Sequence, residues 1–310
     1  MVVMPSNPTP LIDLDWNKFN PWAVTPVTHR LSDDPRFRIE SLVELAKRLD
    51  SKGRIRAHTN AAEAGTSFAN APDLHPVKNN LIHTMEHIEA AKAWMSLLNV
   101  QTDPVYRELV DEVLDSIRSN VELKDPGMGY RGGWIFVSSP KTVTPFHIDK
   151  EHNFILQIKG QKTIYVWEPD DLRVVSERAR DRFHSRHDRG LIAWREEFRE
   201  LAHCFKLSPG QGAYMPSTSP HLVEVEDAPS ITVSFTYYTD STRRDSLTHK
   251  VRGRLAEIGI NIPSSQGASI LDRALYLGAR AARAATRAAY RATGRRVGEE
   301  SATYARAENA

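Results

Sequence analysis

The feature that most constrains the fold is a series of short β-rich segments between residues 134 and 238, separated by glycine and proline turns. The segments cover residues 134–138, 153–158, 162–167, 205–207, 212–215, 222–225 and 230–238. The second and third are joined by Lys159-Gly160-Gln161, the form of a β-hairpin. Because many short strands with such turns are typical of closed or two-layered β architectures, this region predicts a β-barrel or a β-sandwich.

The chain before residue 120 carries a helical pattern instead. The apolar spacing predicts three helices, over residues 34–49, 81–98 and 103–117. Asp34-Pro35 and Asp103-Pro104 supply helix-start signals, each an N-cap followed by proline at the first helical position. Residues 53–76, rich in small and polar side chains, are predicted to form a loop.

Composition limits the class of protein. With 310 residues, 40% of them hydrophobic, the chain can bury the core of one large domain or two small ones. The 41 basic and 39 acidic residues nearly balance, which gives no overall electrostatic case for nucleic acid or membrane. The one cysteine, Cys204, excludes an intrachain disulfide and a cysteine-rich zinc site. Residues 1–10 lack an export signal and no stretch approaches the ~20 apolar residues of a transmembrane segment, so a soluble cytoplasmic protein is expected.

Three regions are expected along the chain. Residues 1–125 form an N-terminal helical region that packs on the core, and residues 126–245 form the β domain. Residues 172–200 are a charged insertion in that domain, with eight arginines, and form either a lid over a pocket or a solvated charged face. Residues 246–310 form a C-terminal helical extension rich in arginine and alanine.

The residues that can carry chemistry are His147, Asp149 and His221. On a strand, residues two apart point to the same face, so His147 and Asp149 can reach one metal ion together. His221 can supply a third ligand from a distant strand, because the sequence from Gly210 to His221 predicts a turn, a short strand and a rigid turn that orients the imidazole. Two histidines and one carboxylate that leave three positions open suit non-haem iron(II), although manganese, cobalt or nickel can occupy such a set in vitro.

The surroundings of this set resemble a known family. Residues 144–167, TPFHIDKEHNFILQIKGQKTIYVW, are similar to the metal-binding core of the JmjC-type, cupin-like oxygenases. The resemblance covers residues 133–238 and is strongest to the branch of the asparaginyl hydroxylase that inhibits hypoxia-inducible factor. That branch has a Thr three residues before the first His, an Asn six after it and a Lys fifteen after it, as Thr144, Asn153 and Lys162 stand here. The resemblance implies a double-stranded β-helix fold with iron(II), 2-oxoglutarate as cosubstrate and dioxygen.

The resemblance also implies roles for individual residues. Lys162 would pair with the distal carboxylate of 2-oxoglutarate, and the Thr144 hydroxyl would donate to the same group. Asn153 would orient the other end of the cosubstrate or a metal-bound group. For Lys162 the alternative is a hairpin lysine that points to solvent.

The sequence departs from the family at several positions. Where the ordinary cupin pattern has a second His and a later Glu, this chain has Asp149 and Asn153. Ser234 stands near an Asn of the asparaginyl hydroxylase and is a further candidate contact to the cosubstrate. The family's tyrosine contact comes from an earlier segment, for which Tyr130 is the candidate.

Two further patterns, a histidine motif at residues 83–87 and an arginine stripe in the C-terminal region, suggest other functions. His83-Thr-Met-Glu86-His87 matches a zinc-peptidase motif on a predicted helix, but the motif is short, no downstream glutamate ligand is evident, and an ordinary amphipathic helix is the preferred interpretation. In the C-terminal region Arg273, Arg280, Arg283, Arg287 and Arg291 fall on one stripe of a helix whose opposite side, from Leu271 to Ala289, is mostly small. That side can dock on the barrel or on a second subunit, and the second case gives a homodimer. The stripe can meet nucleic acid or another acidic surface, or form a merely solvated basic face.

Three functions remain open at this point. The first is an iron(II)- and 2-oxoglutarate-dependent oxygenase that hydroxylates a protein side chain or a small metabolite, with formation of succinate and CO2. The second is a metal-binding cupin-like module without turnover, which serves as a sensor or scaffold. The third is an isomerase or lyase that uses the metal without 2-oxoglutarate. Thr144 and Lys162 distinguish among them, because only the first function needs an anchor for a dicarboxylate.

Overall fold

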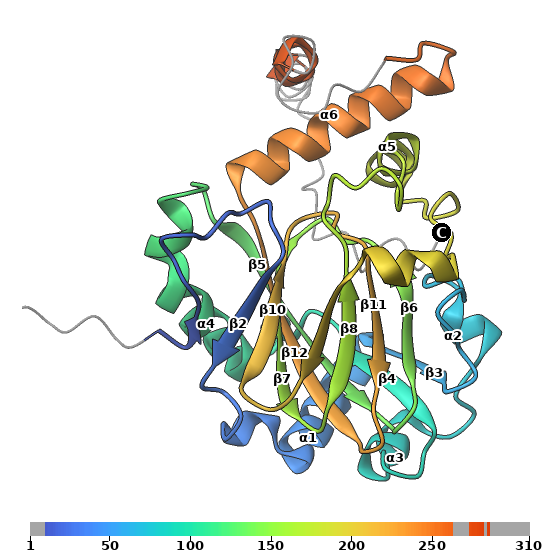
Figure 1. Cartoon of the computed structure of the whole chain (residues 1–310). Coiled ribbons are helices and arrows are strands. Elements are labelled where there is room, and N and C mark those ends of the chain that lie inside the picture. The colour runs from blue at the N-terminus through green and yellow to red at the C-terminus, as the bar shows by residue number, and fades with distance from the viewer. Residues whose placement is uncertain (1–9, 263–272, 282–283, 286–310) are drawn as a thin grey trace, which may run out of the picture. The chain divides into compact units, whose positions relative to one another are not determined.

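A computed structural model describes residues 10–262, 273–281 and 284–285, and two antiparallel sheets dominate it (Figure 1). The strands are β1 (Ile12–Asp13), β2 (Thr25–His29), β3 (Ile55–Thr59), β4 (Ala93–Leu97), β5 (Gly129–Ser138), β6 (Val143–His147), β7 (His152–Lys159), β8 (Lys162–Val166), β9 (His203–Leu207), β10 (Gln211–Met215), β11 (His221–Val225) and β12 (Ser230–Tyr238). The helices are α1 (Ile39–Asp50), α2 (Ala71–Leu74), α3 (Leu81–Glu86), α4 (Pro104–Glu122), α5 (Glu177–Arg186) and α6 (Asp240–Glu257), with 3₁₀ turns η1 (Pro35–Phe37), η2 (Val100–Thr102) and η3 (Glu196–Leu201).

The two sheets pack face to face. The larger has the strand order β1-β2-β10-β7-β12-β5-β4-β3, and the smaller has the order β6-β11-β8-β9. Side chains from both sheets meet in one inner cluster, in which Ile155 and Met215 of the larger sheet join Ile164 and Val223 of the smaller. The predicted fold class is confirmed: the core is mainly β with flanking helices, consistent with a double-stranded β-helix of the jelly-roll type.

Two helices cover the outer face of the larger sheet. Buried residues of α1, such as Leu45, and of α4, such as Val113, share a second cluster with outward residues of the sheet, such as Val233 and Phe235. Asp103 caps α4 by accepting from the Val105 N–H, as the sequence predicts. Because helices occupy its outer side, the inner face of the sheet is available to line a pocket.

Two predictions for the N-terminal half were wrong. The helix over residues 81–98 ends at Glu86, and residues 93–97 form β4, which pairs with β3 and β5. Lys92 turns the chain with a left-handed φ of 52° just before this strand. The loop predicted for residues 53–76 contains β3. Every residue of β4 is buried, and a short strand covered on both faces shows no period-2 pattern that would separate it from a buried helix.

The N-terminal region is therefore not only helical, because β1 to β4 all join the larger sheet. By its internal contacts the chain divides into two compact units. The first runs to Pro169 and includes Ala193–Thr239; the second consists of Asp170–Ile192 and the chain from Asp240 onward. The boundaries expected after residues 125 and 245 stay predictions.

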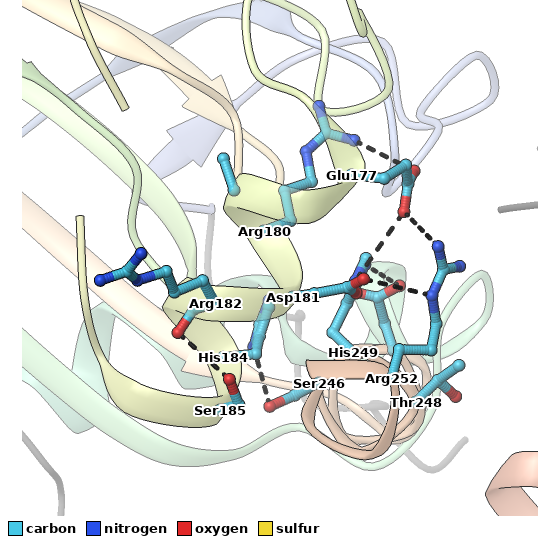
Figure 2. Close-up of polar contacts among 12 residues, drawn as sticks. Glu177, Arg180, Asp181, Arg182, His184, Ser185, Ser246, Thr248, His249 and Arg252 are labelled. Carbon is cyan, nitrogen blue, oxygen red and sulfur yellow. Dashed lines mark hydrogen bonds and ion pairs between the residues drawn. The ribbon is translucent and has the colours of Figure 1, made fainter. Parts of the chain in front are cut away.

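The second unit is built on α5 and α6, whose facing polar side chains are drawn in Figure 2. A helical stretch at residues 273–281 carries Arg273 and Arg280, both exposed. The other members of the stripe, Arg283, Arg287 and Arg291, lie outside the described residues, and so do Leu271 and Ala289 of its opposite side. The homodimer and the contact with an acidic surface stay predictions. Among the helices of the described ranges, none combines the length and the apolar character needed to cross a membrane.

Candidate functional site

The three predicted metal ligands converge between neighbouring strands. His147 is the last residue of β6 and lies directly opposite His221, the first residue of β11. The Asp149 Oδ2 atom lies 3.5 Å from His147 Nε2 and 3.7 Å from His221 Nε2. The potential ligand atoms of the three side chains all lie within 4.8 Å of one another. Both imidazoles are buried, at 3% and 6% exposed.

Backbone carbonyls orient both imidazoles. His147 Nδ1 lies 2.7 Å from the carbonyl oxygen of Pro145, and His221 Nδ1 lies 3.0 Å from that of Ser219. A carbonyl oxygen can only accept, so each Nδ1 carries a proton, and in the neutral imidazole Nε2 is the atom that has the lone pair. This is the tautomer that a metal-binding histidine needs.

The donor set fits an octahedral divalent ion. Adjacent ligands with bonds of about 2.1 Å lie about 3 Å apart, close to the separations between Asp149 and the two imidazoles. Two neutral imidazoles and one carboxylate on a single side of an ion form the facial arrangement typical of non-haem iron(II). The residues present therefore fit the group that the sequence implies.

Asp149 reaches this position for a reason that strand periodicity alone does not give. It lies two residues beyond the end of β6, so it does not share a regular strand with His147. Its carbonyl oxygen instead accepts the N–H of Thr218, a residue with a left-handed φ of 62° in the turn before His221. The turn thus ties the carboxylate segment to the second histidine.

An aromatic side chain covers one face of the first histidine. The Phe68 ring stacks on His147 with centroids 3.7 Å apart and an angle of 5° between the planes. The Arg56 guanidinium lies 4.3 Å from the Phe68 centroid and donates to the Phe68 carbonyl oxygen. The loop that carries Phe68 is joined to β6 by the Phe146 N–H, which donates to Ala64 O. These contacts exclude water from that side of the ring.

Lys162 begins β8 with only 2% of its surface exposed, so it points inward and not to solvent. It shares this face with Ile164 and Val166, both in the inner cluster. In the described ranges no carboxylate forms an ion pair with its Nζ atom, which lies 5.7 Å from the Phe136 ring centroid. Burial lowers the pKa of Lys162 to about 7. A buried ammonium group of this kind favours an anionic ligand.

Lys162 and the histidines lie at two levels of one face. On the paired strands β8 and β11, Lys162 lies opposite Val225 and Val166 lies opposite His221. Four residues at about 3.3 Å each separate these levels by about 13 Å. Thr144 lies between them, opposite Val223 on β11.

Trp94 was missed at the sequence level and prepares Thr144 for a ligand. Its indole N–H donates to Thr144 Oγ1 over 2.7 Å, and its ring stacks on His58 with centroids 4.7 Å apart. Because Oγ1 already accepts from Trp94, the hydroxyl hydrogen of Thr144 is directed elsewhere. Reading residues 93–97 as an alternating strand would have placed Trp94 and Ser96 on the inner face.

The remaining candidates differ in their placement. Asn153 and Ser234 are buried on the inner face of β7 and β12, and neither Asn153 Oδ1 nor Ser234 Oγ has a hydrogen-bond partner in the described part of the chain. Buried polar atoms of this kind suit a bound polar group. Tyr130 is 65% exposed and packs edge-to-face on Tyr238, so it does not line the interior.

The peptidase-like motif lies elsewhere. His83, Glu86 and His87 bring their ligand atoms within 4.8 Å of one another, but all three are exposed on and just after the six-residue helix α3. Asn80 caps this helix by accepting from the Ile82 and His83 N–H groups. The motif therefore belongs to a short surface helix and not to the barrel interior.

Comparison with known proteins identifies the family. A model of the cupin-like domain family matches residues 20–243, so the chain belongs to this family. No curated protein matches at a significant level.

Among solved structures the chain is similar to the ribosomal oxygenase YcfD of Escherichia coli. The complex with cobalt and 2-oxoglutarate is 14% identical, with 88% of this chain and 67% of that chain covered and a TM-score of 0.47. The complex with cobalt and succinic acid is 17% identical, with 88% of this chain and 67% of that chain covered and a TM-score of 0.44. A further YcfD structure is 14% identical, with 82% of this chain and 59% of that chain covered and a TM-score of 0.45. The chain thus spans about three fifths to two thirds of these proteins. Likeness at this level does not transfer an activity.

Proposed function

We propose that the chain is an iron(II)- and 2-oxoglutarate-dependent oxygenase that hydroxylates a protein side chain or a small metabolite. One observation carries the proposal. The facial ligand set of His147, Asp149 and His221 shares the inner face of one barrel with Lys162, a buried cation for which no carboxylate partner is found among the described residues. A metal module alone would not need such a cation. A cosubstrate with a second carboxylate would.

The candidate residues lie at two levels of the inner face and would bind different groups. At one level the two imidazoles and Asp149 would hold iron(II) and leave three adjacent positions for ligands. At the other level Lys162 and the Thr144 hydroxyl would bind the distal carboxylate, and the two levels are about 13 Å apart, a distance that side chains and a five-carbon dicarboxylate together would span. Asn153 and Ser234 offer further polar contacts from the opposite sheet.

With these groups bound, iron(II) and 2-oxoglutarate supply the oxidation: dioxygen converts a C–H bond to C–OH while 2-oxoglutarate becomes succinate and CO2. The contribution of the chain is to bind, orient and exclude water. Buried imidazoles held by carbonyl oxygens keep the ligand geometry fixed, and Phe68 shields one side of the site. No side chain is required as a general acid or base.

The test is anaerobic addition of iron(II) and 2-oxoglutarate to the full chain. We expect a visible metal-to-ligand charge-transfer band, followed in air by slow formation of succinate without added substrate. Metal binding without the band would instead indicate a sensor or scaffold, or an isomerase or lyase that does not use 2-oxoglutarate. That result would overturn the oxygenase proposal.

A further inference from the structure

The two segments that carry the metal ligands are joined by three hydrogen bonds from adjacent residues. The Ser217 N–H donates to His152 Nδ1 over 3.1 Å, and its hydroxyl donates to Lys150 O over 2.7 Å. The Thr218 N–H donates to Asp149 O over 2.8 Å. The turn before the second histidine is thus fastened along the segment that follows the first.

His152 is the one side chain among these contacts that is buried completely, at 0% exposed. Because the Ser217 N–H points at its Nδ1, that atom accepts and the ring proton lies on Nε2. Nε2 lies 3.5 Å from Asp125 Oδ2, and the same oxygen accepts from the Thr239 hydroxyl over 2.7 Å. The nearby carboxylate oxygen electrostatically favours the tautomer with its proton on Nε2, which is the tautomer whose Nδ1 lone pair faces the turn.

We propose that His152, held by Asp125, is a positioning residue that sets the separation between the Asp149 carboxylate and the His221 imidazole. The inference rests on the proposed function, because it assigns this couple a role toward the metal. The path from His152 to each ligand is short. The bond to His152 fixes the Ser217 backbone and, with it, the next two residues. The Thr218 N–H donates to the carbonyl oxygen of Asp149, and the carbonyl oxygen of Ser219 orients His221.

An apolar residue of similar size would fill the space but leave the Ser217 N–H without its acceptor. The turn would then be free to shift. Outer partners of metal ligands contribute about 10–100-fold to metal affinity, since a displacement near 1 Å spoils a ligand set. His152→Leu is therefore expected to weaken metal binding by 10–100-fold. His152→Asn keeps an acceptor oxygen near the position of Nδ1 and should retain most of the affinity.

The chain offers a matched control in the same sheet. His29 on β2 is also buried, its Nδ1 accepts the Leu31 N–H over 3.1 Å, and its Nε2 lies 2.9 Å from Gln157 O. His29→Leu removes the same kind of contact but touches neither ligand segment. It should lower thermal stability without changing metal affinity.

The experiment measures anaerobic cobalt(II) affinity and the visible d–d spectrum of the full chain and its variants. We expect His152→Leu to bind weakly with an altered spectrum, Asp125→Asn to lie between it and the wild type, and His152→Asn and His29→Leu to resemble the wild type. Unchanged affinity and spectrum in both His152→Leu and Asp125→Asn would overturn the inference alone. If His152→Leu does not fold, the cobalt(II) affinities and spectra of Asp125→Asn and His29→Leu are compared instead. Weaker binding in Asp125→Asn alone supports the inference, and equal binding in the two variants overturns it.

Wild-type protein that binds no cobalt, or binds it unchanged after His147→Ala, would instead refute the proposed metal centre, and this inference with it. The wild-type and His147→Ala titrations therefore separate failure of the function from failure of the positioning role.

Discussion

Two clusters of imidazole and carboxylate groups in this chain contain the same residue types but different surroundings. One is His147, Asp149 and His221 in the barrel; the other is Glu177, Asp181 and His249 on α5 and α6 (Figure 2). In both, the potential ligand atoms lie within 4.8 Å of one another. By spacing alone, either would qualify as a metal site.

The difference lies in what faces the ring nitrogens. In the barrel each Nδ1 meets a carbonyl oxygen, and both Nε2 atoms face the same carboxylate, Asp149. On α5 and α6 both nitrogens of His249 meet carboxylates, since Nδ1 lies 2.7 Å from Asp181 Oδ1 and Nε2 lies 3.5 Å from Asp245 Oδ1. Although burial opposes the charge, Asp245, Asp181 and Glu177 raise the pKa of His249.

The cations differ as well. Arg252 lies 3.5 Å from Glu177 Oε2 and 3.4 Å from Asp181 Oδ2, so the acids of the second cluster already have partners. Lys162 in the barrel has no such carboxylate in the described ranges. The first cluster is thus arranged to bind a metal ion and an anionic ligand, whereas the charged groups of the second cluster pair with one another in an ion network.

The largest expected effect tests this distinction directly. His221→Ala should weaken cobalt(II) binding by more than about 100-fold, because it removes a ligand outright. His249→Ala should leave cobalt affinity and stoichiometry unchanged. Both are measured by anaerobic titration of the full chain. A fall in stoichiometry from two ions to one in His249→Ala would break the comparison and make the second cluster a metal site.

The next effect concerns the cation in the barrel. Lys162→Ala should weaken 2-oxoglutarate binding on the order of 100-fold, about 3 kcal/mol for one partner of a desolvated charge pair, and leave iron affinity unchanged. Lys159→Ala is the matched control, because Lys159 lies three residues away and is exposed. Equal 2-oxoglutarate affinities in the two variants would remove Lys162 from the binding site.

The pH dependence of 2-oxoglutarate binding sharpens the same contrast. Because the pKa of Lys162 is lowered to about 7, the side chain is mostly neutral at pH 8 before a ligand binds. A dicarboxylate stabilises the charged form, so binding at pH 8 should take up close to one proton and affinity should fall as pH rises above 7. At pH 6 no uptake is expected. Calorimetry in buffers of different ionisation enthalpy measures the uptake, which Lys162→Ala should abolish.

The second cluster should respond to pH in its own way. A histidine whose folded pKa exceeds its unfolded value near 6.5 stabilises the fold fully below that value, and the contribution is lost as pH rises through the folded pKa. Amide hydrogen exchange of residues 177–186, corrected for intrinsic rates, should therefore show about tenfold less protection at high pH than at pH 6, the equivalent of a charge-assisted hydrogen bond of about 1.5 kcal/mol. His249→Asn should flatten the profile; a wild-type profile already flat would mean that His249 does not titrate.

The part of the site that was predictable from sequence is the part held by local pattern. The β-rich runs of residues 134–238 appear as β5 and β7 to β12, and the side chains of His147, Asp149 and His221 converge. Lys162 points inward because it follows the tight turn at Gly160 and alternates with Ile164 and Val166. Turns and alternation are encoded within a few residues, so a single sequence reveals them.

The part that was not predictable depends on pairing between distant segments. β4 is buried on both faces only because β3 and β5 flank it, and its inner face brings Trp94 to Thr144, fifty residues away. Asp149 depends on the turn at Thr218, far along the chain. No local signal records either contact, since tertiary pairing overrides the apolar spacing that suggested a helix.

The smallest expected effect tests that unpredicted contact. Trp94→Phe keeps most of the ring packing but removes the indole N–H that directs the Thr144 hydroxyl, so 2-oxoglutarate should bind about 2–10-fold more weakly, as for one hydrogen bond of about 0.5–1.5 kcal/mol. Trp167→Phe is the control: its N–H donates to Phe198 O over 2.8 Å and contacts none of the site residues. Iron affinity should be unchanged in both, because neither indole touches a ligand. Equal 2-oxoglutarate affinities of Trp94→Phe and Trp167→Phe would mean that the Thr144 hydroxyl does not need the Trp94 indole N–H to orient it. Its hydroxyl would then be oriented by the bound carboxylate itself, as the ion network on α5 and α6 is oriented by its own members.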